Sequence, residues 1–270
     1  MARAAVAEDV GRGDITTTAI VPENAQARAV IVAKQAGVLA GMPLIREVKR
    51  VLDRHTRVTL LAVEGSMVRP GQRIASIDGS LRAILTGERV TLNFLSRLSG
   101  IATLTRAFVR EAGRHGVAIL DTRKTTPLLR TLEKYAVRVG GGRNHRLNLS
   151  SAVLIKDNHI EAAGSLPRAV RLVRARLGRK APIQVEAQSL RQVREAIAAR
   201  VEFIMLDNLP HGVLRKALRM MRGRAKAEVS GGVTLKTVRR LAKLKPDYIS
   251  VGALTHSAPA IDFSLEILKK

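Results

Sequence analysis

The chain has 270 residues, of which 46% are hydrophobic, enough for one large or two modest globular domains with buried cores. It has no cysteine, which excludes disulfide frameworks, thiolate metal sites and cysteine nucleophiles. Lysine and arginine number 47 against 22 acidic residues, giving a formal net charge of +25. Such an excess indicates a phosphate-rich small substrate, a nucleic acid partner or a merely basic surface. Aromatic residues make up only 2%, which disfavours the stacking that binds single-stranded nucleic acids.

No stretch of the sequence is apolar for long enough to span a membrane, and residues 1–9 lack the apolar core of a signal peptide. The sequence therefore predicts a cytoplasmic protein without a membrane segment.

Residues 1–115 mix strand and helix patterns. Residues 27–33 are typical of a strand, and residues 63–74 indicate a strand, a turn at Pro70-Gly71 and a second strand. Between residues 82 and 114, apolar side chains recur at helical intervals, which predicts two helices interrupted near Ser99-Gly100. We therefore expect an α+β N-terminal domain with connecting helices.

The pattern changes after residue 116 to short apolar runs that end abruptly in polar residues or glycine. Amphipathic stretches separate several of these runs, and the last four end at residues 185, 206, 229 and 251, a spacing typical of βα units. We predict an irregular, incomplete (β/α) barrel over residues 116–270, and a doubly wound sheet is the alternative. Six strands are expected, with a possible seventh at 138–142; the six runs are 117–120, 152–155, 183–185, 203–206, 227–229 and 248–251.

Chemically active side chains follow these runs. Because strand carboxyl ends converge at one mouth of a barrel, we expect a cationic cluster there that suits carboxylates and phosphates. The alternative is an ordinary solvated basic face. The candidate cations are Arg123, Lys124, His145, Arg146 and Lys156.

Two acids and two glycine-containing segments are predicted at the same mouth. Glu186 and Asp207 could hold Mg²⁺ through water, bind ribose hydroxyls or stabilise a developing positive charge, or could instead form structural ion pairs with Lys156 or Arg123. The segments Ser230-Gly231-Gly232 and Gly252-Ala253 could bring backbone N–H groups close to a phosphate, or could be ordinary tight turns.

These residues resemble the quinolinate phosphoribosyltransferase family over nearly the whole chain. The segments that carry the resemblance are residues 8–16, 88–89, 92–93, 99–103, 121–127, 133–136, 140–146, 154–159, 206–208, 230–232 and 251–253. The resemblance implies phosphoribosyl transfer from phosphoribosyl pyrophosphate to quinolinate with Mg²⁺ present, giving nicotinate mononucleotide, pyrophosphate and carbon dioxide in NAD biosynthesis.

The resemblance also implies roles for individual residues. Quinolinate would be held by Arg123, His145 and Arg146, with Arg89 supplied across a homodimer interface, and Lys124 and Lys156 would contact quinolinate or the diphosphate. Glu186 and Asp207 would hold ribose hydroxyls and Mg²⁺, and the 5′-phosphate would lie against Ser230, Gly231, Gly232, Gly252 and Ala253. The implied fold is an open-faced sandwich followed by an irregular barrel, and the extreme C-terminus is expected to pack on the N-terminal domain.

The chain departs from the family pattern at several positions. Gln184 and Gln188 stand where the family usually has acids, Ser151 stands where it often has Asp, and Leu128 where it often has Gly. Two alternatives follow: a related transferase that uses nicotinate or another planar acid, and a nucleic-acid-binding protein suggested by the net charge. Neither a specific nucleic acid partner nor a membrane is expected.

Overall fold

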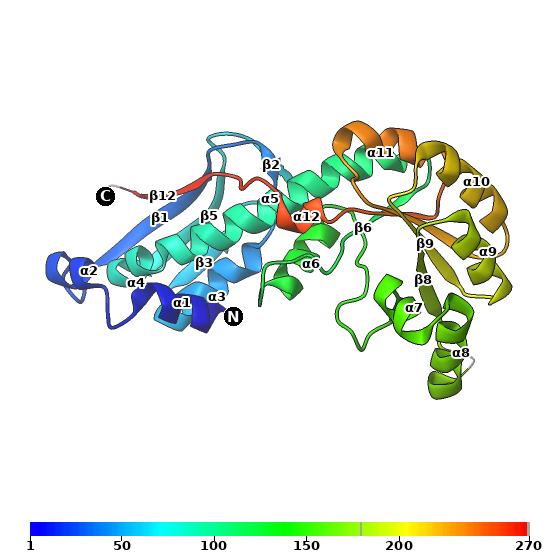
Figure 1. Ribbon diagram of the computed structural model, residues 1–270. Coiled ribbons are helices and arrows are strands. Elements are labelled where there is room, and N and C mark those ends of the chain that lie inside the picture. Colours follow the sequence, from blue (N-terminus) through cyan, green and yellow to red (C-terminus); the bar gives the residue numbers. More distant parts are fainter. Residues whose placement is uncertain (179, 269–270) are drawn as a thin grey trace. The chain divides into compact units, whose positions relative to one another are not determined.

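The computed structural model describes residues 1–178 and 180–268, which group into two compact units (Figure 1). The first unit contains residues 1–106, 138–140 and the chain from 258 onward; the second contains residues 107–137 and 141–257. The division into domains of residues 1–115 and 116–270 remains a prediction. No helix in the described part of the chain is long and apolar enough to cross a membrane.

The first unit is built on a four-stranded antiparallel sheet with the strand order β12-β1-β5-β3. Helices cover one face of this sheet, and their apolar side chains join those of the strands in a single buried core. The elements are α1 (Ala2–Val10), α2 (Ile15–Ile20), β1 (Gln26–Ala33), β2 (Gly37–Val38), α3 (Met42–Leu52), β3 (Arg57–Leu60), β4 (Met67–Val68), β5 (Arg73–Ser80), α4 (Leu81–Thr86), α5 (Glu88–Gly113) and β12 (Phe263–Ile267); the end of α5 belongs to the second unit.

Strand β3 shows the difference between the two faces of this sheet. Val58 and Leu60 pack against the core, whereas Arg57 and Thr59 alternate with them and are exposed, as the two-residue period of a strand requires. Ile31, Ile74 and Ile77 are fully buried in that core, and each such side chain stabilises the fold by about 1.5–3 kcal/mol. The expected open-faced sandwich is thus formed.

Two predictions about this unit were wrong in detail. The turn at Pro70-Gly71 forms, but β4 pairs with β2 while β5 pairs with β1 and β3, so the strands around the turn join different sheets. The helix break lies at Gly87, not near Gly100. A Cβ on Gly100 would lie 2.1 Å from the carbonyl oxygen of Pro259, so this glycine lets a distant segment cross an uninterrupted helix.

The second unit is built on a six-stranded parallel sheet with the order β6-β11-β10-β9-β8-β7. The strands follow the chain order, and the last of them returns to pair with β6 as in a barrel, but β6 and β7 do not pair. The elements are β6 (Ala118–Leu120), α6 (Arg130–Val139), β7 (Val153–Ile155), α7 (Asp157–Ala163), α8 (Leu166–Leu177), β8 (Ile183–Ala187), α9 (Leu190–Ala198), β9 (Phe203–Asp207), α10 (His211–Met221), β10 (Lys226–Ser230), α11 (Leu235–Ala242), β11 (Tyr248–Ser250) and α12 (Ala253–His256).

This arrangement confirms the predicted incomplete barrel over the doubly wound alternative. Helices α8, α9 and α10 pack in succession along one side of the sheet (Figure 1). The possible seventh strand at 138–142 does not form. Residues 130–139 are helical and Arg143 makes only an isolated bridge to Leu120, because Val137 shares the buried face of α6 with Glu133, one helical turn earlier.

Candidate active site

Strand register brings the predicted residues of the second unit to the carboxyl edge of the sheet. Ile155 of β7 lies opposite Val185 of β8, so Lys156 and Glu186 are both one residue further along. Asp207 at the end of β9 lies opposite Ser230 of β10, and Leu120 at the end of β6 lies opposite Ser250 of β11. The loops that follow β6, β7, β10 and β11 therefore begin at the same edge.

Lys156 and Glu186 form an ion pair at this edge, with 3.3 Å between the ammonium nitrogen and a carboxylate oxygen. The lysine side chain is about half exposed and the glutamate is almost buried. Because one partner reaches solvent, the pair itself adds little to stability. The backbone N–H of Lys156 donates to Nδ1 of His159 at 3.0 Å, which closes the first turn of α7 and fixes the lysine backbone.

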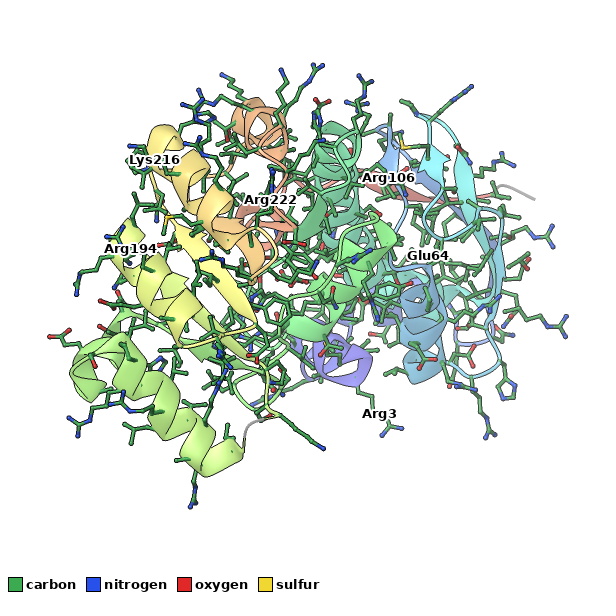
Figure 2. All side chains as sticks on the ribbon, turned by 90° about the vertical axis from the view of Figure 1, so that its right-hand side faces the viewer. Arg3, Glu64, Arg106, Arg194, Lys216 and Arg222 are labelled. Carbon is green, nitrogen blue, oxygen red and sulfur yellow. The ribbon has the colours of Figure 1, made fainter. Side chains whose placement is uncertain are left out.

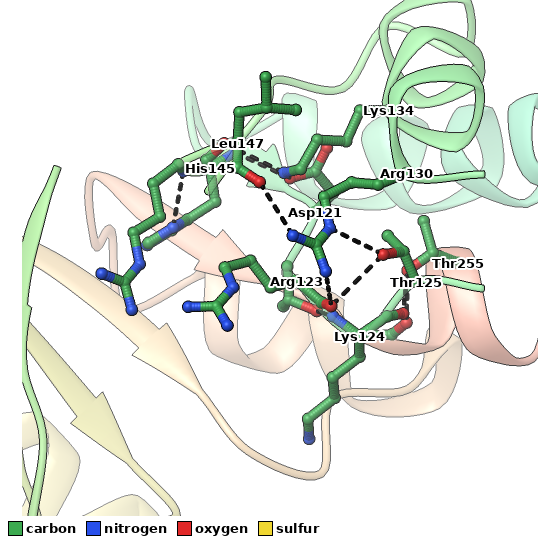
Figure 3. A network of polar contacts seen from close by, with 12 residues as sticks. Asp121, Arg123, Lys124, Thr125, Arg130, Lys134, His145, Leu147 and Thr255 are labelled. Carbon is green, nitrogen blue, oxygen red and sulfur yellow. Dashed lines mark hydrogen bonds and ion pairs between the residues drawn. The ribbon is translucent and has the colours of Figure 1, made fainter. Parts of the chain in front are cut away.

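Arg123 and Arg146 form a pair of neighbouring cations. Burial, and then the charge of Arg123, lower the pKa of Arg146. Nε of Arg123 is buried and has no hydrogen-bond partner within the described residues, and neither arginine has a carboxylate partner there. Figure 3 shows the Arg123 and Lys124 side chains ending without a drawn interaction. A buried N–H donor without a partner and two neighbouring positive charges are typical of an anion-binding site.

A buried scaffold holds these cations in place (Figure 3). Asp121 and Lys134 form a fully buried ion pair, and burial both raises the pKa of Asp121 and lowers that of Lys134. Asp121 also accepts from the backbone N–H of His145 at 2.8 Å. Arg130 donates to Thr125 Oγ1 at 2.9 Å and to the carbonyl oxygen of Leu147 at 3.3 Å. The loop after β6 and the segment before β7 are therefore tied together.

His145 lies in a second network with Gln184 and Glu228. Its Nδ1 accepts from the backbone N–H of Arg146 at 2.9 Å, so the ring proton is on Nε2, which lies 3.1 Å from Gln184 Oε1 and 3.4 Å from Glu228 Oε2. Gln184 Nε2 in turn donates to Glu228 at 2.6 Å. Both ring nitrogens are engaged within the protein, so His145 orients the backbone of Arg146.

Glu228 and Asp121 were missed in the sequence analysis. Glu228 is buried in the middle of β10 between Ala227 and Val229. A charged residue inside a short apolar run is the signal that could have revealed it, since buried carboxylates are rare without a partner. For Asp121, the buried partner Lys134 lies on α6, and sequence spacing alone gives no sign of that contact.

The two glycine-containing segments are shaped by close contacts. Gly231 has φ +97°, and a Cβ there would lie 2.1 Å from Oδ1 of Asn208. At Gly252 a Cβ would lie 3.1 Å from Cδ of Lys124, and Thr255 Oγ1 donates to the carbonyl oxygen of Lys124 at 2.7 Å. The β10 loop thus packs on the residue after Asp207, and the β11 loop packs on the cationic loop after β6.

Asp207 has no cationic partner within residues 1–178 and 180–268 and accepts from the amide of Asn208 at 3.0 Å. The same residues contain no cluster of three or more side chains that would ligate a metal without help. Mg²⁺ is commonly held by one or two carboxylates together with substrate phosphates. Glu186 and Asp207 fit that mode of binding.

Arg89 lies in the first unit, in the first turn of α5. It lines a cavity of about 440 Å³ together with residues of α1 and the segments around α2 and α4. Asp14 in that lining caps α2 by accepting from the backbone N–H of Thr17 at 2.9 Å, and hydrogen bonds to Thr17 lower its pKa.

The fold and this edge together define an α/β-barrel enzyme for substrates that carry several negative charges. Two family models match the chain: "Quinolinate phosphoribosyl transferase, C-terminal domain" over residues 101–266 and "Quinolinate phosphoribosyl transferase, N-terminal domain" over residues 14–99. The chain therefore belongs to the quinolinate phosphoribosyltransferase family, which confirms the predicted resemblance.

Individual relatives are similar over nearly their whole length. A probable nicotinate-nucleotide pyrophosphorylase [carboxylating] of Bacillus subtilis is 44% identical over 96% of this chain and 90% of its own. The crystal structure of NadC from Streptococcus pyogenes matches with a TM-score of 0.94 at 44% identity, covering 99% of this chain and 96% of that one. The nicotinate-nucleotide pyrophosphorylase from Ehrlichia chaffeensis matches with a TM-score of 0.95 at 37% identity, covering 99% and 97%.

Proposed function

We propose that this enzyme transfers the phosphoribosyl group of phosphoribosyl pyrophosphate to quinolinate, with decarboxylation, in NAD biosynthesis. The observation that carries the proposal is the pair Arg123 and Arg146, two neighbouring cations without a carboxylate partner in the described residues, one of them with a buried unpaired N–H. Quinolinate is a dicarboxylate, and planar guanidinium groups bind carboxylates in a fixed orientation. The naming of relatives as carboxylating pyrophosphorylases supports the same reaction.

In this proposal the residues at the edge of the sheet bind and orient both substrates. Arg123 and Arg146 hold the carboxylates of quinolinate, and His145 positions Arg146. Lys124 and Lys156 contact quinolinate or the diphosphate. Ser230, Gly231, Gly232, Gly252 and Ala253 surround the 5′-phosphate, with backbone N–H groups as donors.

The reaction then needs charge stabilisation and positioning but no covalent enzyme intermediate. The bond between the ribosyl carbon and pyrophosphate breaks, and the pyridine nitrogen forms the new bond while Glu186 and Asp207 stabilise the positive ribosyl carbon. The charged ring accepts the electron pair as carbon dioxide leaves, and a proton takes its place. Held in position away from water, the ring needs little further assistance.

We further propose that Mg²⁺ accompanies the diphosphate and is held by Glu186 and Asp207, directly or through water. The metal would neutralise charge on the leaving pyrophosphate. A homodimer in the cytoplasm, with Arg89 completing the partner's site, is also part of the proposal. The localisation needs its own test, because a relative from rice is described as chloroplastic.

The reaction is tested with carboxyl-labelled quinolinate, phosphoribosyl pyrophosphate and Mg²⁺. We expect nicotinate mononucleotide and labelled carbon dioxide in equal amounts, and no product when Mg²⁺ is chelated. Lys156→Ala should lower kcat/KM by about 100-fold or more, whereas Lys216→Ala, which removes an exposed lysine of α10, should have no effect. Transfer to nicotinate without carbon dioxide release would contradict the proposal.

The shared site is tested by mixing two inactive variants, Arg89→Ala and Lys156→Ala. If Arg89 acts across the interface of a two-fold dimer, each mixed dimer contains one intact site, and random mixing restores about a quarter of wild-type activity. If Arg89 acts in its own subunit, every site lacks either Arg89 or Lys156, and mixing restores no activity.

A further inference from the structure

A second basic feature of the barrel unit lies at the amino edge of the parallel sheet, where β9, β10 and β11 begin. A cavity of about 750 Å³ opens there, and its lining includes Glu202, Lys226 and Asp247, which stand at the starts of these three strands. The proposed active site uses the carboxyl edge of the same strands. The cavity is therefore outside that site.

The lining of this cavity carries far more positive than negative charge. Seven cationic side chains face two carboxylates; the cations are Arg215, Arg219, Arg222, Arg224, Lys226, Lys243 and Lys245. Figure 2 shows Arg222, at the end of α10, among many other side chains tipped with nitrogen. A helix carboxyl end carries only about half an elementary negative charge, so the ends of α10 and α11 balance about one of the seven.

Both carboxylates of the lining already have partners. Asp247 accepts from Lys226 at 2.7 Å and from the backbone N–H of Ala227 at 2.9 Å. Glu202 accepts from the backbone N–H of Ile183 at 2.7 Å and lies 3.6 Å from Arg174. The other six cations of the lining make no side-chain hydrogen bond or ion pair to any described residue.

The shape and composition of the cavity restrict its ligand. A volume of this size is in the range of small-molecule sites, and the lining also includes the apolar side chains of Leu218, Met221 and Leu244. The residues that line it include no Phe or Tyr, so nothing there would stack on a base. Clustered arginines and lysines without acids suit several phosphates close together.

We propose that this cavity is a second anion site, which binds a small phosphate-rich molecule through its phosphate groups. The inference does not depend on the proposed function, because it uses none of the residues assigned to the reaction. The phosphates could belong to a free polyphosphate or to a nucleic acid backbone, and the size of the cavity and the absence of aromatic lining favour the free polyphosphate.

The test measures binding of sodium tripolyphosphate by calorimetry at about 0.15 M salt, together with amide hydrogen exchange of residues 219–227 and 242–248. We expect saturable binding with protection of these two segments. The variant Arg219→Gln, Arg222→Gln, Arg224→Gln should lower the affinity of the site that protects these segments by about tenfold or more. It should leave turnover unchanged. A second variant, Arg215→Gln with Lys243→Gln, should also weaken the binding of tripolyphosphate. It keeps the proposal testable if the triple variant does not fold.

The matched control is Arg171→Gln, Arg176→Gln, Arg194→Gln, which removes the same charge from exposed arginines of α8 and α9 outside the cavity. It should change the affinity by less than about twofold. Equal weakening in the control would mean attraction to net charge alone, and would overturn the proposal. So would an absence of protection at the two segments, or protection by a single-stranded oligonucleotide but not by tripolyphosphate.

Discussion

Glu228 is the buried carboxylate on which the His145 network depends. It accepts from Gln184 at 2.6 Å and lies 3.4 Å from His145, while its second oxygen has no partner in the described residues. The family pattern usually has an acid at position 184, and an acid there would place two carboxylates in contact. The amide of Gln184 instead donates to Glu228 and accepts from His145, so the single carboxylate of Glu228 is in contact with both Gln184 and His145.

The variant Glu228→Gln should raise the KM for quinolinate about tenfold while changing kcat less. Gln184 and His145 both contact Oε2 of Glu228. An amide in its place lacks the negative charge that strengthens both contacts, so the Arg146 backbone is held less firmly. Steady-state kinetics measure the split. Glu195→Gln, whose carboxylate pairs with Arg191 at the surface, is the control. A lower kcat at unchanged KM would contradict a positioning role.

Lys49 offers a test by pH in the first unit. Its side chain is fully buried and donates to the carbonyl oxygen of Ile84 at 2.9 Å, and burial lowers its pKa from 10.5 to about 8. Between these two values the unfolded chain binds more protons than the folded one, so stability rises with pH. Relative to Lys49→Met, the wild type should gain up to about 3 kcal/mol from pH 8 to 10.5. Denaturant unfolding of both proteins measures the difference, and a difference that does not change with pH would contradict the burial of the charge.

At the scale of the elements, the loops after β10 and β11 each contain a glycine at a position where a Cβ atom would lie very close to a neighbouring residue. Gly231 combines a left-handed φ of +97° with the close approach of Asn208, and Asn208 itself has a φ of +52°. Of these two residues only Asn208 is a non-glycine residue in the left-handed region, and such conformations are common where a backbone approaches a ligand.

We expect Gly231→Ala to weaken binding of phosphoribosyl pyrophosphate about tenfold or more, because the new methyl group displaces Asn208 and the loop with it. Gly116→Ala is the matched control, since Gly116 also has a left-handed φ, +73°, but no atom would lie within 4 Å of its Cβ. The control should lose stability without loss of affinity. Equal affinity in the two variants, measured by titration calorimetry, would show that the close contact does not matter.

These elements also show what could be predicted from the sequence. The short buried strands end in sharp changes of polarity, so their carboxyl edge and the residues beyond it were predictable. The helix through Gly100 was not, because that glycine serves a contact with Pro259, far away in the sequence. Nor was the conformation of Leu128, which has a φ of +65° where the family pattern often has Gly; the strain becomes visible only when the backbone is known.

At the scale of the whole molecule, the net charge of +25 should act on anionic substrates before they bind. Long-range attraction raises association rates and is screened by salt. We expect kcat/KM for phosphoribosyl pyrophosphate to fall by roughly tenfold between about 0.01 M and 0.5 M ionic strength. Circular dichroism at each salt concentration controls for unfolding. A value of kcat/KM that does not change with salt would mean that the surplus cations do not assist substrate capture.

The pairing of β12 with β1 has a consequence for synthesis on the ribosome. Residues 263–267 form an edge of the sheet whose neighbouring strand is residues 26–33. When β1 emerges, its hydrogen-bonding groups on that side have no partner until the entire second unit has been translated. A nascent chain therefore carries an open strand edge through most of its elongation, and such edges are sites of aggregation. Chaperones that shield exposed strands would be needed longest by this part of the molecule. A separately expressed first unit would need the segment from residue 258 onward supplied by fusion.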